Sequence, residues 1–287
     1  MKSIVITGAS TGIGRAVAEH MAAQGWKVFA GVRKAADGDA LIAAQPSIIP
    51  VILDVTNPEQ IRAAAQIVSD QLDGYTLSGL VNNAGIANMG PLPVQPMDEI
   101  RKHFDINVLG VIEVTQNFLP LLGTETDRTG AAGRIINISS FGGRIPSPFL
   151  GAYCATKTAL ESLTDSFRRE LLPFGIDAIT VAPGAIKTPI WDKSEDHLAE
   201  SPYANTVWNE PIKSYNEMFL QAGANGWPAS KIAELVESAL TIAKPKAYYA
   251  VGPERLNNYS VARRLPKRLL DKGMGKRFGL LPGDNDT

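Results

Sequence analysis

Short apolar runs rich in β-branched residues alternate along the chain with longer segments of helical spacing. Each apolar run predicts a strand: Ile4–Thr7, Val28–Ala30, Ile48–Leu53, Leu80–Asn82, Arg134–Ile138, Ile176–Val181 and, near the end, Lys246–Val251. Because these runs are apolar on both faces, they are typical of parallel strands that are covered by helices on both sides.

The segments between the strands have the length and spacing of amphipathic helices. They include Ile13–Gln24, Pro58–Gln71, Asp98–Leu122 and Ala152–Leu172. In the second of these, Ile61, Ala64 and Val68 fall on one stripe of a helix. This alternation predicts an α/β fold, a doubly wound, seven-stranded parallel sheet with helices on both faces and right-handed crossovers.

The alternation lapses between about residues 185 and 228. This stretch is polar but carries six aromatic residues, Trp191, Tyr203, Trp208, Tyr215, Phe219 and Trp227. An insert of this length inside a compact domain is usually functional or disordered. A helical pattern returns from Ile232 to Leu240, and no linker or repeat interrupts the chain, so we predict one domain over residues 1–287.

Composition narrows the function classes. The chain has 287 residues, 45% of them hydrophobic, and 28 Lys+Arg against 29 Asp+Glu, which argues against both disorder and nucleic-acid binding. One Cys and three scattered His offer neither a disulfide framework nor a metal site. The apolar start is too short for a signal peptide, and no uninterrupted apolar stretch of ~18 residues occurs, so we predict a cytoplasmic protein.

A glycine-rich turn follows the first predicted strand. It reads Thr7-Gly8-Ala9-Ser10-Thr11-Gly12-Ile13-Gly14 and opens into a helix. Glycines permit a tight turn and close approach of a pyrophosphate, which binds the free N–H groups of a helix N-terminus. No Lys follows the last glycine, which disfavours a kinase-type phosphate loop. We predict a Rossmann-like dinucleotide site with Gly8, Ser10, Thr11, Gly12, Ile13 and Gly14 at the cofactor.

The end of the second strand bears on the choice of cofactor. An NAD site commonly has an acid ~20 residues beyond the glycines, where it accepts the ribose 2′-hydroxyl. This chain has Val32-Arg33-Lys34 there, so Arg33 is placed to meet a 2′-phosphate, with Lys34, Arg15, Ser10 or Thr11 as helpers. We predict NADP as the cofactor. A solvated basic turn and use of NAD are the alternatives.

Tyr153 and Lys157 lie early in a predicted helix, with the spacing that places both side chains on one face. A free phenol has a pKa of ~10, and a neighbouring ammonium would lower that pKa and favour the phenolate. Such a pair can act as an acid–base centre. The spacing alone is common by chance and does not define a function.

Taken together, the motifs resemble the short-chain dehydrogenase/reductase family, in its non-extended branch. The resemblance spans about residues 3–190 and rests on Thr7-Gly8-x-x-x-Gly12-x-Gly14, Asn82-Asn83-Ala84-Gly85, Asn107, Ser139-Ser140, Tyr153-x-x-x-Lys157 and Pro183-Gly184-x-x-x-Thr188. It implies an enzyme that transfers a hydride between a nicotinamide cofactor and a secondary alcohol or ketone (EC 1.1.1.-).

The resemblance also implies the catalytic roles. Tyr153 would be the general acid/base, and Lys157 would depress its pKa and hydrogen-bond the nicotinamide ribose. Ser140 would hold the substrate oxygen, with Ser139 as its non-catalytic neighbour. Asn107 would bind a water that links Lys157 to solvent.

The same comparison implies further cofactor contacts. Asp54 would contact the adenine, and Asn82, Ala84 and Gly85 would wall the adenosine. The carboxamide and pyrophosphate contacts would come from Pro183, Gly184, Ile186 and Thr188. For Asp54 and Asn83 a purely structural role is equally open.

The substrate class follows from the insert, which occupies the position of the family's substrate lid. Its aromatic residues, with Phe141, Phe149 and Leu150, suggest an apolar pocket, unless they only cover the domain. The chain resembles steroid- and retinol-type members, so we predict a lipophilic steroid, retinoid or alkyl substrate. The alternatives are an NAD-dependent dehydrogenase of a small polar alcohol, a non-catalytic dinucleotide sensor or scaffold, and an extended-branch epimerase or dehydratase, which the glycine spacing opposes.

The C-terminal extension, about residues 255–287, is basic. From Arg255 to Phe278 it carries eight Lys/Arg and one acid, a charge of +7 against −6 over residues 1–254 and −2 over residues 279–287. Its apolar residues recur at roughly helical spacing, which predicts an amphipathic helix that contacts a membrane peripherally or packs over the pocket or a partner subunit. We predict a homodimer through Asp98–Leu122 and Ala152–Leu172, with a tetramer as the alternative.

Overall fold

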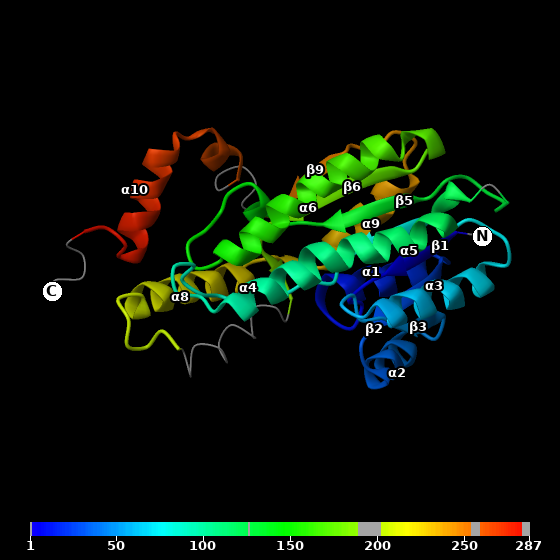
Figure 1. Cartoon of the computed structure of the whole chain (residues 1–287), viewed down its shortest axis with the longest axis horizontal. Coiled ribbons are helices and arrows are strands. Elements are labelled where there is room, and N and C mark those ends of the chain that lie inside the picture. Colours follow the sequence, from blue (N-terminus) through cyan, green and yellow to red (C-terminus); the bar gives the residue numbers. More distant parts are fainter. Residues whose placement is uncertain (1, 126, 189–201, 254–258, 283–287) are drawn as a thin grey trace.

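The computed structural model describes residues 2–125, 127–188, 202–253 and 259–282, and its sheet has the predicted order of elements (Figure 1). Seven parallel strands run in the order β3-β2-β1-β4-β5-β6-β9. Their bounds are β1 Ser3–Ile6, β2 Lys27–Val32, β3 Ile48–Ile52, β4 Gly79–Asn82, β5 Arg134–Ile138, β6 Asp177–Pro183 and β9 Tyr248–Val251. The doubly wound sheet predicted from the apolar runs is confirmed, and the strand order reverses between β1 and β4, where such sheets bind ligands.

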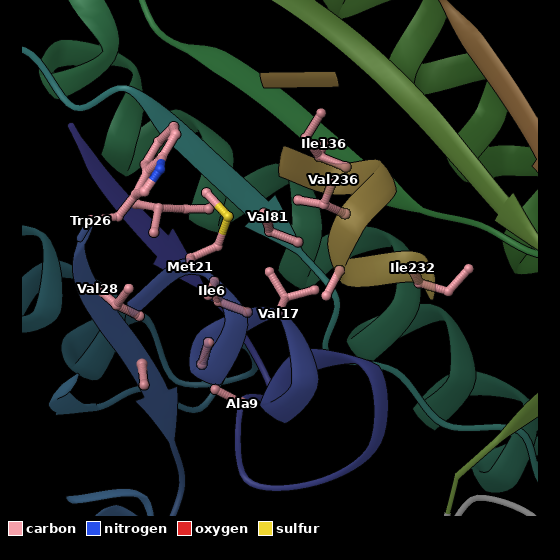
Figure 2. Close-up of a cluster of buried hydrophobic side chains, with 14 of the residues drawn as sticks. Ile6, Ala9, Val17, Met21, Trp26, Val28, Val81, Ile136, Ile232 and Val236 are labelled. Atoms are coloured by element: carbon pink, nitrogen blue, oxygen red, sulfur yellow. The ribbon is translucent and has the colours of Figure 1, made fainter. Parts of the chain in front are cut away.

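One face of the sheet is covered by α1 (Gly12–Ala23), α2 (Ala35–Ala44) and α9 (Ser230–Thr241). Figure 2 shows Val17 and Met21 of α1 meeting Ile232 and Val236 of α9 over the strands. All four of these side chains are fully buried. This packing fixes the start of α1, and with it the glycine turn.

The other face is covered by α3 (Pro58–Leu72), α5 (Gly110–Leu119) and α6 (Gly151–Glu170). Ile61 of α3 and Phe118 of α5 are fully buried here against the strands, and Leu80 of β4 lies beneath them. α3 begins at a capped end, because the Asn57 side chain accepts hydrogen bonds from the N–H groups of Glu59 and Gln60. The predicted stripe of α3 therefore faces the core.

The helix predicted over Asp98–Leu122 is present but irregular. It consists of α4 (Met97–Phe104), a π-helical turn η1 (Asp105–Leu109), α5 and a second π-helical turn η2 (Pro120–Thr124). The helical segment Met97–Thr124 is long and apolar enough to cross a membrane, with a mean hydropathy of 1.2. Half of its most apolar stretch is buried inside the protein, which is also found for core helices. π-helical turns are frequent at functional sites, and η1 carries Asn107.

Helix α2 is the element that the sequence pattern did not reveal. It begins directly after Lys34, and Gly38 packs against Pro50 of β3. Only Gly38 and Leu41 are buried in it, so it has no continuous apolar stripe. The short 3-10 turns η3 (Phe141–Gly143) and η4 (Leu172–Phe174) flank α6.

The insert is partly ordered into regular structure. Strand β7 (Ile186–Lys187) pairs in parallel with β8 (Trp227–Pro228), and α8 (Asn209–Ala224) lies between them in the chain. The predicted aromatic Trp191 lies outside the described residues. In Figure 1, α8 lies at the end of the molecule away from the N-terminus.

The C-terminal segment is divided where one helix was predicted. It contains the 3-10 turn η6 (Ala262–Arg264) and α10 (Lys267–Phe278), and Pro266 stands between them. Arg255 lies outside the described residues. α10 lies at the same end of the molecule as α8 (Figure 1) and packs against it. The ring of Phe278 meets that of Tyr215 edge-on at 5.2 Å.

Candidate active site

The glycine turn is fastened to the end of β4 by Thr7 and Asn83. The hydroxyl of Thr7 accepts hydrogen bonds from the N–H groups of Asn83 and Ala84, both at 3.0 Å. The amide of Asn83 donates to the carbonyl oxygens of Thr7 and Gly8, also at 3.0 Å. Asn83 therefore holds the turn together, and it also lines the cavity described next, so its contact with a cofactor stays a prediction.

Glycine is required in this turn on steric grounds. Gly8 and Gly12 have φ angles of 63° and 58°, in the left-handed region that favours glycine. A Cβ atom on Gly14 would collide with the carbonyl oxygen of Gly8 and the side-chain amide of Asn83. The backbone thus forms a close-packed cradle that a side chain would fill, which fits a dinucleotide pyrophosphate.

The N-terminus of α1 opens onto a cavity of ≈ 730 Å³. Gly8, Ser10, Thr11, Gly12 and Ile13 line this cavity, and Thr11 makes no side-chain cap to the helix. The first N–H groups of a helix have no partner within it, so they favour an anion at this position. The turn can therefore hold a pyrophosphate without further basic residues.

Arg33 and Asp54 follow the ends of β2 and β3 and line the same cavity. Arg33 is exposed and forms no ion pair with any residue that the structure describes. Of its predicted helpers, Ser10 and Thr11 line the cavity, whereas Arg15 pairs with Glu19 at 2.7 Å and Lys34 is not in the lining.

The carboxylate of Asp54 accepts two hydrogen bonds from Thr56, from its N–H at 2.9 Å and its hydroxyl at 2.7 Å. It thus closes the turn before α3, and Asp54 also lines the cavity, while its contact with the adenine stays a prediction.

The predicted catalytic residues lie together midway along the cavity. Tyr153 and Lys157 are one turn apart on α6, and the Ser140 side chain lies close enough to Tyr153 to act on the pKa of its phenol. The Nζ atom of Lys157 donates to the carbonyl oxygen of Ile138 at 2.8 Å and lies 5.7 Å from the centre of the Tyr153 ring. Lys157 is only 5% exposed, so its ammonium is held rigidly against the tyrosine.

Burial dominates the acid–base properties of this pair. It raises the pKa of Tyr153 to about 12, although the Ser140 side chain acts in the opposite direction. Burial also lowers the pKa of Lys157 to about 8. The expectation that Lys157 lowers the pKa of Tyr153 is not met in this structure, because loss of water around the phenolate is the largest influence on that pKa. At neutral pH the phenol is therefore protonated and can act as an acid.

The two adjacent serines have different surroundings. The hydroxyl of Ser139 donates to Oε1 of Glu161 at 2.9 Å, away from the reacting groups. The Oγ of Ser140 accepts from the N–H of Gly142 at 3.2 Å and lies near Tyr153, whose pKa it acts to lower. This geometry favours Ser140 over Ser139 for contact with a substrate oxygen.

Asn107 is fully buried in η1 beside these residues but does not line the cavity. Its amide pairs with the backbone of Ile86, Oδ1 accepting from N–H and Nδ2 donating to C=O, both at 2.9 Å. Nδ2 also donates to Thr156 at 3.0 Å. The side chain thus fixes the segment after Gly85, while its part in a water-mediated proton path stays a prediction.

The other predicted cofactor residues divide into two groups. Ala84, Gly85, Pro183, Gly184, Ile186 and Thr188 line the cavity. Gly14 and Asn82 do not, and the amide of Asn82 donates to Asn137 at 2.8 Å and Thr115 at 3.0 Å inside the core. Asn82 thus ties β4 to β5 and α5, so its side chain faces away from the cofactor position. Among the described residues, no group of three or more His, Cys, Asp and Glu gathers into a metal site.

Beyond Tyr153 the cavity becomes an apolar space, here called the substrate chamber. Its walls come from the segment before α6, from α8 and from the C-terminal segment, and they comprise Ile145, Leu150, Cys154, Tyr215, Met218, Phe219, Val261, Leu265, Leu269, Leu270, Met274 and Phe278. The predicted pocket residue Phe149 is buried behind this wall, edge-on to Tyr215 at 5.6 Å. The basic segment was expected either to contact a membrane or to pack over the pocket or a partner subunit, and α10 lines the chamber.

A buried polar cluster joins the C-terminal segment to the catalytic loop. Glu161, 9% exposed, accepts hydrogen bonds from Ser139, from Nε of Arg144 at 2.7 Å and from the Tyr248 hydroxyl at 3.0 Å. The Tyr248 and Tyr259 hydroxyls are 2.8 Å apart. These residues form the Glu161 network, which anchors the segment before α10 next to Ser140.

Comparison with known proteins agrees with this geometry. The short chain dehydrogenase family model matches residues 2–199. An NADPH-dependent 3-dehydrocapnine reductase from Ornithobacterium rhinotracheale is 34% identical over 273 residues, which cover 95% of both chains. Retinol dehydrogenase 7 of Rattus norvegicus is 32% identical and covers 94% of this chain and 86% of that one.

A solved structure of a short chain dehydrogenase/reductase from Burkholderia phymatum in complex with NAD is also similar. It superposes with a TM-score of 0.76 at 27% identity and covers 95% of both chains. The chain therefore belongs to the short-chain dehydrogenase/reductase family, and it is an NAD(P)-dependent oxidoreductase of that family.

Proposed function

We propose that this protein transfers a hydride between NADP(H) and a lipophilic secondary alcohol or ketone. The observation that carries this proposal is one continuous cavity, which runs from the glycine turn past Tyr153 into the apolar substrate chamber. A nicotinamide cofactor that enters from the glycine turn and a lipophilic substrate that enters from the chamber would meet at Tyr153.

The preference for NADP rests on Arg33. Its guanidinium follows β2, lines the cofactor end of the cavity and is not neutralised by any described carboxylate. An acid at this position would accept the ribose hydroxyls of NAD, whereas an arginine suits a 2′-phosphate. The relative from Ornithobacterium rhinotracheale is named as NADPH-dependent, and the Burkholderia phymatum structure contains NAD, so both cofactors occur among related proteins.

In the proposed mechanism, the bound nicotinamide supplies or accepts the hydride. Ser140 holds the substrate oxygen, and the Tyr153 hydroxyl donates its proton to that oxygen in ketone reduction or takes one from an alcohol. Lys157 stabilises the phenolate that forms and binds the nicotinamide ribose. Asn107 holds the backbone after Gly85 and places the water through which Lys157 is reprotonated.

The lipophilic substrate class is supported by the walls of the chamber. The residues beyond Tyr153 are mostly Leu, Met, Phe and Ile, and they bury an alkyl chain or ring system favourably. Within one domain, α8 of the insert and α10 of the C-terminal segment line the chamber, and we assign the insert the role of substrate lid.

The proposal also covers the cellular location and the oligomeric state of the enzyme. We place it in the cytoplasm, with peripheral membrane contact through the basic C-terminal segment, and we expect a homodimer through α4–α5 and α6. Sedimentation with anionic liposomes, compared before and after removal of residues 255–287, tests the membrane contact. Light scattering tests the dimer.

A cofactor comparison tests the proposal. Wild-type enzyme is expected to reduce medium-chain ketones with NADPH in preference to NADH. Arg33→Ser is expected to lower the NADPH/NADH ratio of kcat/KM by about 10- to 100-fold, the loss typical of hydrogen bonds to a charged group. Lys34→Ser, a neighbouring basic residue outside the cavity lining, is the matched control. A preference for NADH in the wild type would overturn the NADP assignment.

A further inference from the structure

The charged residues of the cavity are few, and one of them has no part in the proposed chemistry. Along the described lining, the charged side chains are Arg33, Asp54, Lys157 and Arg277. The first two lie at the cofactor end and Lys157 lies at Tyr153. Arg277, in the last turn of α10, is the charged side chain of the substrate chamber.

Arg277 stands at the junction of two cavities. A second recess of ≈ 450 Å³ is lined by Ser214, Glu217 and Gln221 of α8, together with three residues that also line the chamber, Met218, Arg277 and Phe278. The chamber side of this junction is apolar, whereas the recess is polar. A ligand that extends from Tyr153 to Arg277 would thus pass from an apolar to a polar surrounding.

The guanidinium of Arg277 is not committed to a carboxylate within the described part of the chain. Other arginines have such partners, for example Arg144 with Glu161 at 2.7 Å and Arg268 with Asp271 at 3.7 Å. Glu217 borders the same recess but forms no ion pair with Arg277 within 4.0 Å. The Phe278 ring, 5.7 Å from the guanidinium, fixes the backbone at this point because it is buried in the α8–α10 contact.

The charge around Arg277 favours an anion. α10 carries five Lys/Arg, at 267, 268, 272, 276 and 277, and a single acid, Asp271. Among the described residues, Asp271 is already paired with Arg268. The positive potential at the chamber mouth therefore comes from several side chains, but only Arg277 among them lines the chamber.

We propose that Arg277 forms an anion-binding subsite that receives an acidic group at the end of the substrate remote from the reacting carbon. The inference rests on the proposed function and sharpens its substrate class to amphiphilic ketones or alcohols with a terminal oxyanion, a carboxylate, sulfonate or phosphate. A guanidinium binds such groups through charge-assisted, bidentate hydrogen bonds. Ser214 and Gln221 supply further donors in the recess.

A binding experiment tests the subsite without relying on turnover. Dodecanoate and dodecan-1-ol, which share an alkyl chain and differ in charge, are titrated into the enzyme–NADPH complex by calorimetry. Dodecanoate is expected to bind more tightly than dodecan-1-ol. Arg277→Gln is expected to raise the Kd of dodecanoate about tenfold, because a partly exposed ion pair is lost. The Kd of dodecan-1-ol is expected to change by less than twofold.

Arg268→Gln is the matched control. It removes the same charge from the same helix, but Arg268 lies outside the cavity lining. If Arg268→Gln raises the Kd of dodecanoate as much as Arg277→Gln does, the anion is attracted by the total positive charge of α10, and the subsite is refuted. Equal loss for acid and alcohol in Arg277→Gln would also refute it, since the residue would then act only through packing.

Turnover separates this proposal from the proposed function. Keto acids and their methyl esters, with the ketone at increasing distance from the carboxyl group, are reduced with NADPH. The acids are expected to have the lower KM at one preferred distance, and Arg277→Gln is expected to raise that KM about tenfold at unchanged kcat. Selective dodecanoate binding without turnover of any ketone would reject the proposed function and retain the subsite. Turnover with no acid–ester difference would reject the subsite alone.

Discussion

The two halves of the cavity are built in different ways. At the cofactor half, backbone groups define the shape, because Thr7 and Asn83 join two strand ends and Gly8 and Gly14 leave no room for side chains. At the chamber half, side chains of α8 and α10 define the shape, and Phe278 joins these helices through an aromatic contact with Tyr215. A site of the first kind holds one ligand shape, whereas a site of the second kind can change its ligand through single substitutions.

The largest effect is expected between the halves, at Tyr153. Tyr153→Phe removes the proton donor and is expected to lower kcat by about 10³-fold, within the range typical of general acid–base groups, with an unchanged Kd for NADPH. Stopped-flow and fluorescence titration measure the two quantities. Tyr215→Phe removes a hydroxyl from the same cavity, one that bonds Ser147 at 2.9 Å, and is expected to retain most of kcat. An active Tyr153→Phe enzyme would contradict the assigned mechanism.

The next prediction compares the effect of adding one methyl group in each half of the cavity. Gly14→Ala is expected to destabilise the fold by about 2–3 kcal/mol and to weaken NADPH strongly, because its Cβ meets backbone atoms that cannot yield. Gly273→Ala in α10 has no neighbour within 4 Å of the added atom. It is expected to be neutral or to stabilise by up to about 1 kcal/mol. Thermal unfolding measures both, and equal losses would show that the halves do not differ in this way.

The chamber half is tested by Phe278→Ala. Loss of this ring is expected to loosen α10 and to raise KM for lipophilic ketones about tenfold, since the substrate loses apolar cover. The Kd for NADPH is expected to stay unchanged, which steady-state kinetics and titration can check together. Phe174→Ala, the same change at a 45% exposed position outside the cavity lining, should leave both quantities unaltered. A weakened NADPH site in Phe278→Ala would mean that the halves are coupled.

The smallest effect concerns pH. The pKa of Lys157 is lowered to about 8 by burial, so the ammonium loses its proton as the pH rises through that value. Ketone reduction is expected to fall about fivefold between pH 8 and pH 9, while Tyr153, with a pKa raised to about 12, stays protonated. Lys157→Arg keeps its charge and should give a flat, if lower, profile to pH 10. A flat wild-type profile would contradict the role assigned to Lys157.

The contrast between the cofactor half and the chamber half also explains which features could be predicted from the sequence. The strands and the glycine turn were predictable because each depends on local pattern, namely apolar runs and the residues that a tight turn requires. The π-helical turn at Asn107 and the helix α2 were not, since both depend on packing that no local period reveals. The pKa direction of Tyr153 was predicted wrongly, because burial of Tyr153 depends on the whole cavity around it rather than on the Tyr–Lys spacing.

The walls of the chamber also depend on contacts that the local sequence does not reveal. The insert was predicted to lie over the substrate, and its helix α8 lines the chamber. The position of α10 depends on the Glu161 network, in which Glu161 and Tyr248 are 87 residues apart in sequence. Side-chain networks of this kind leave no periodic signal. Ser140 could be distinguished from Ser139 only by family spacing, and the Glu161 bond now supplies a physical reason for that choice.

The Glu161 network bears on how chimeric enzymes of this family could be made. A C-terminal segment exchanged between relatives would bring a new chamber wall, and hence a new substrate range, without touching the cofactor half. Such an exchange would also replace Tyr259 and leave Tyr248, Arg144 and Glu161 behind, so that the Tyr248 hydroxyl would keep its bond to Glu161 but lose its second partner. The crossover point should therefore lie before β9, so that both tyrosines travel with the wall they support.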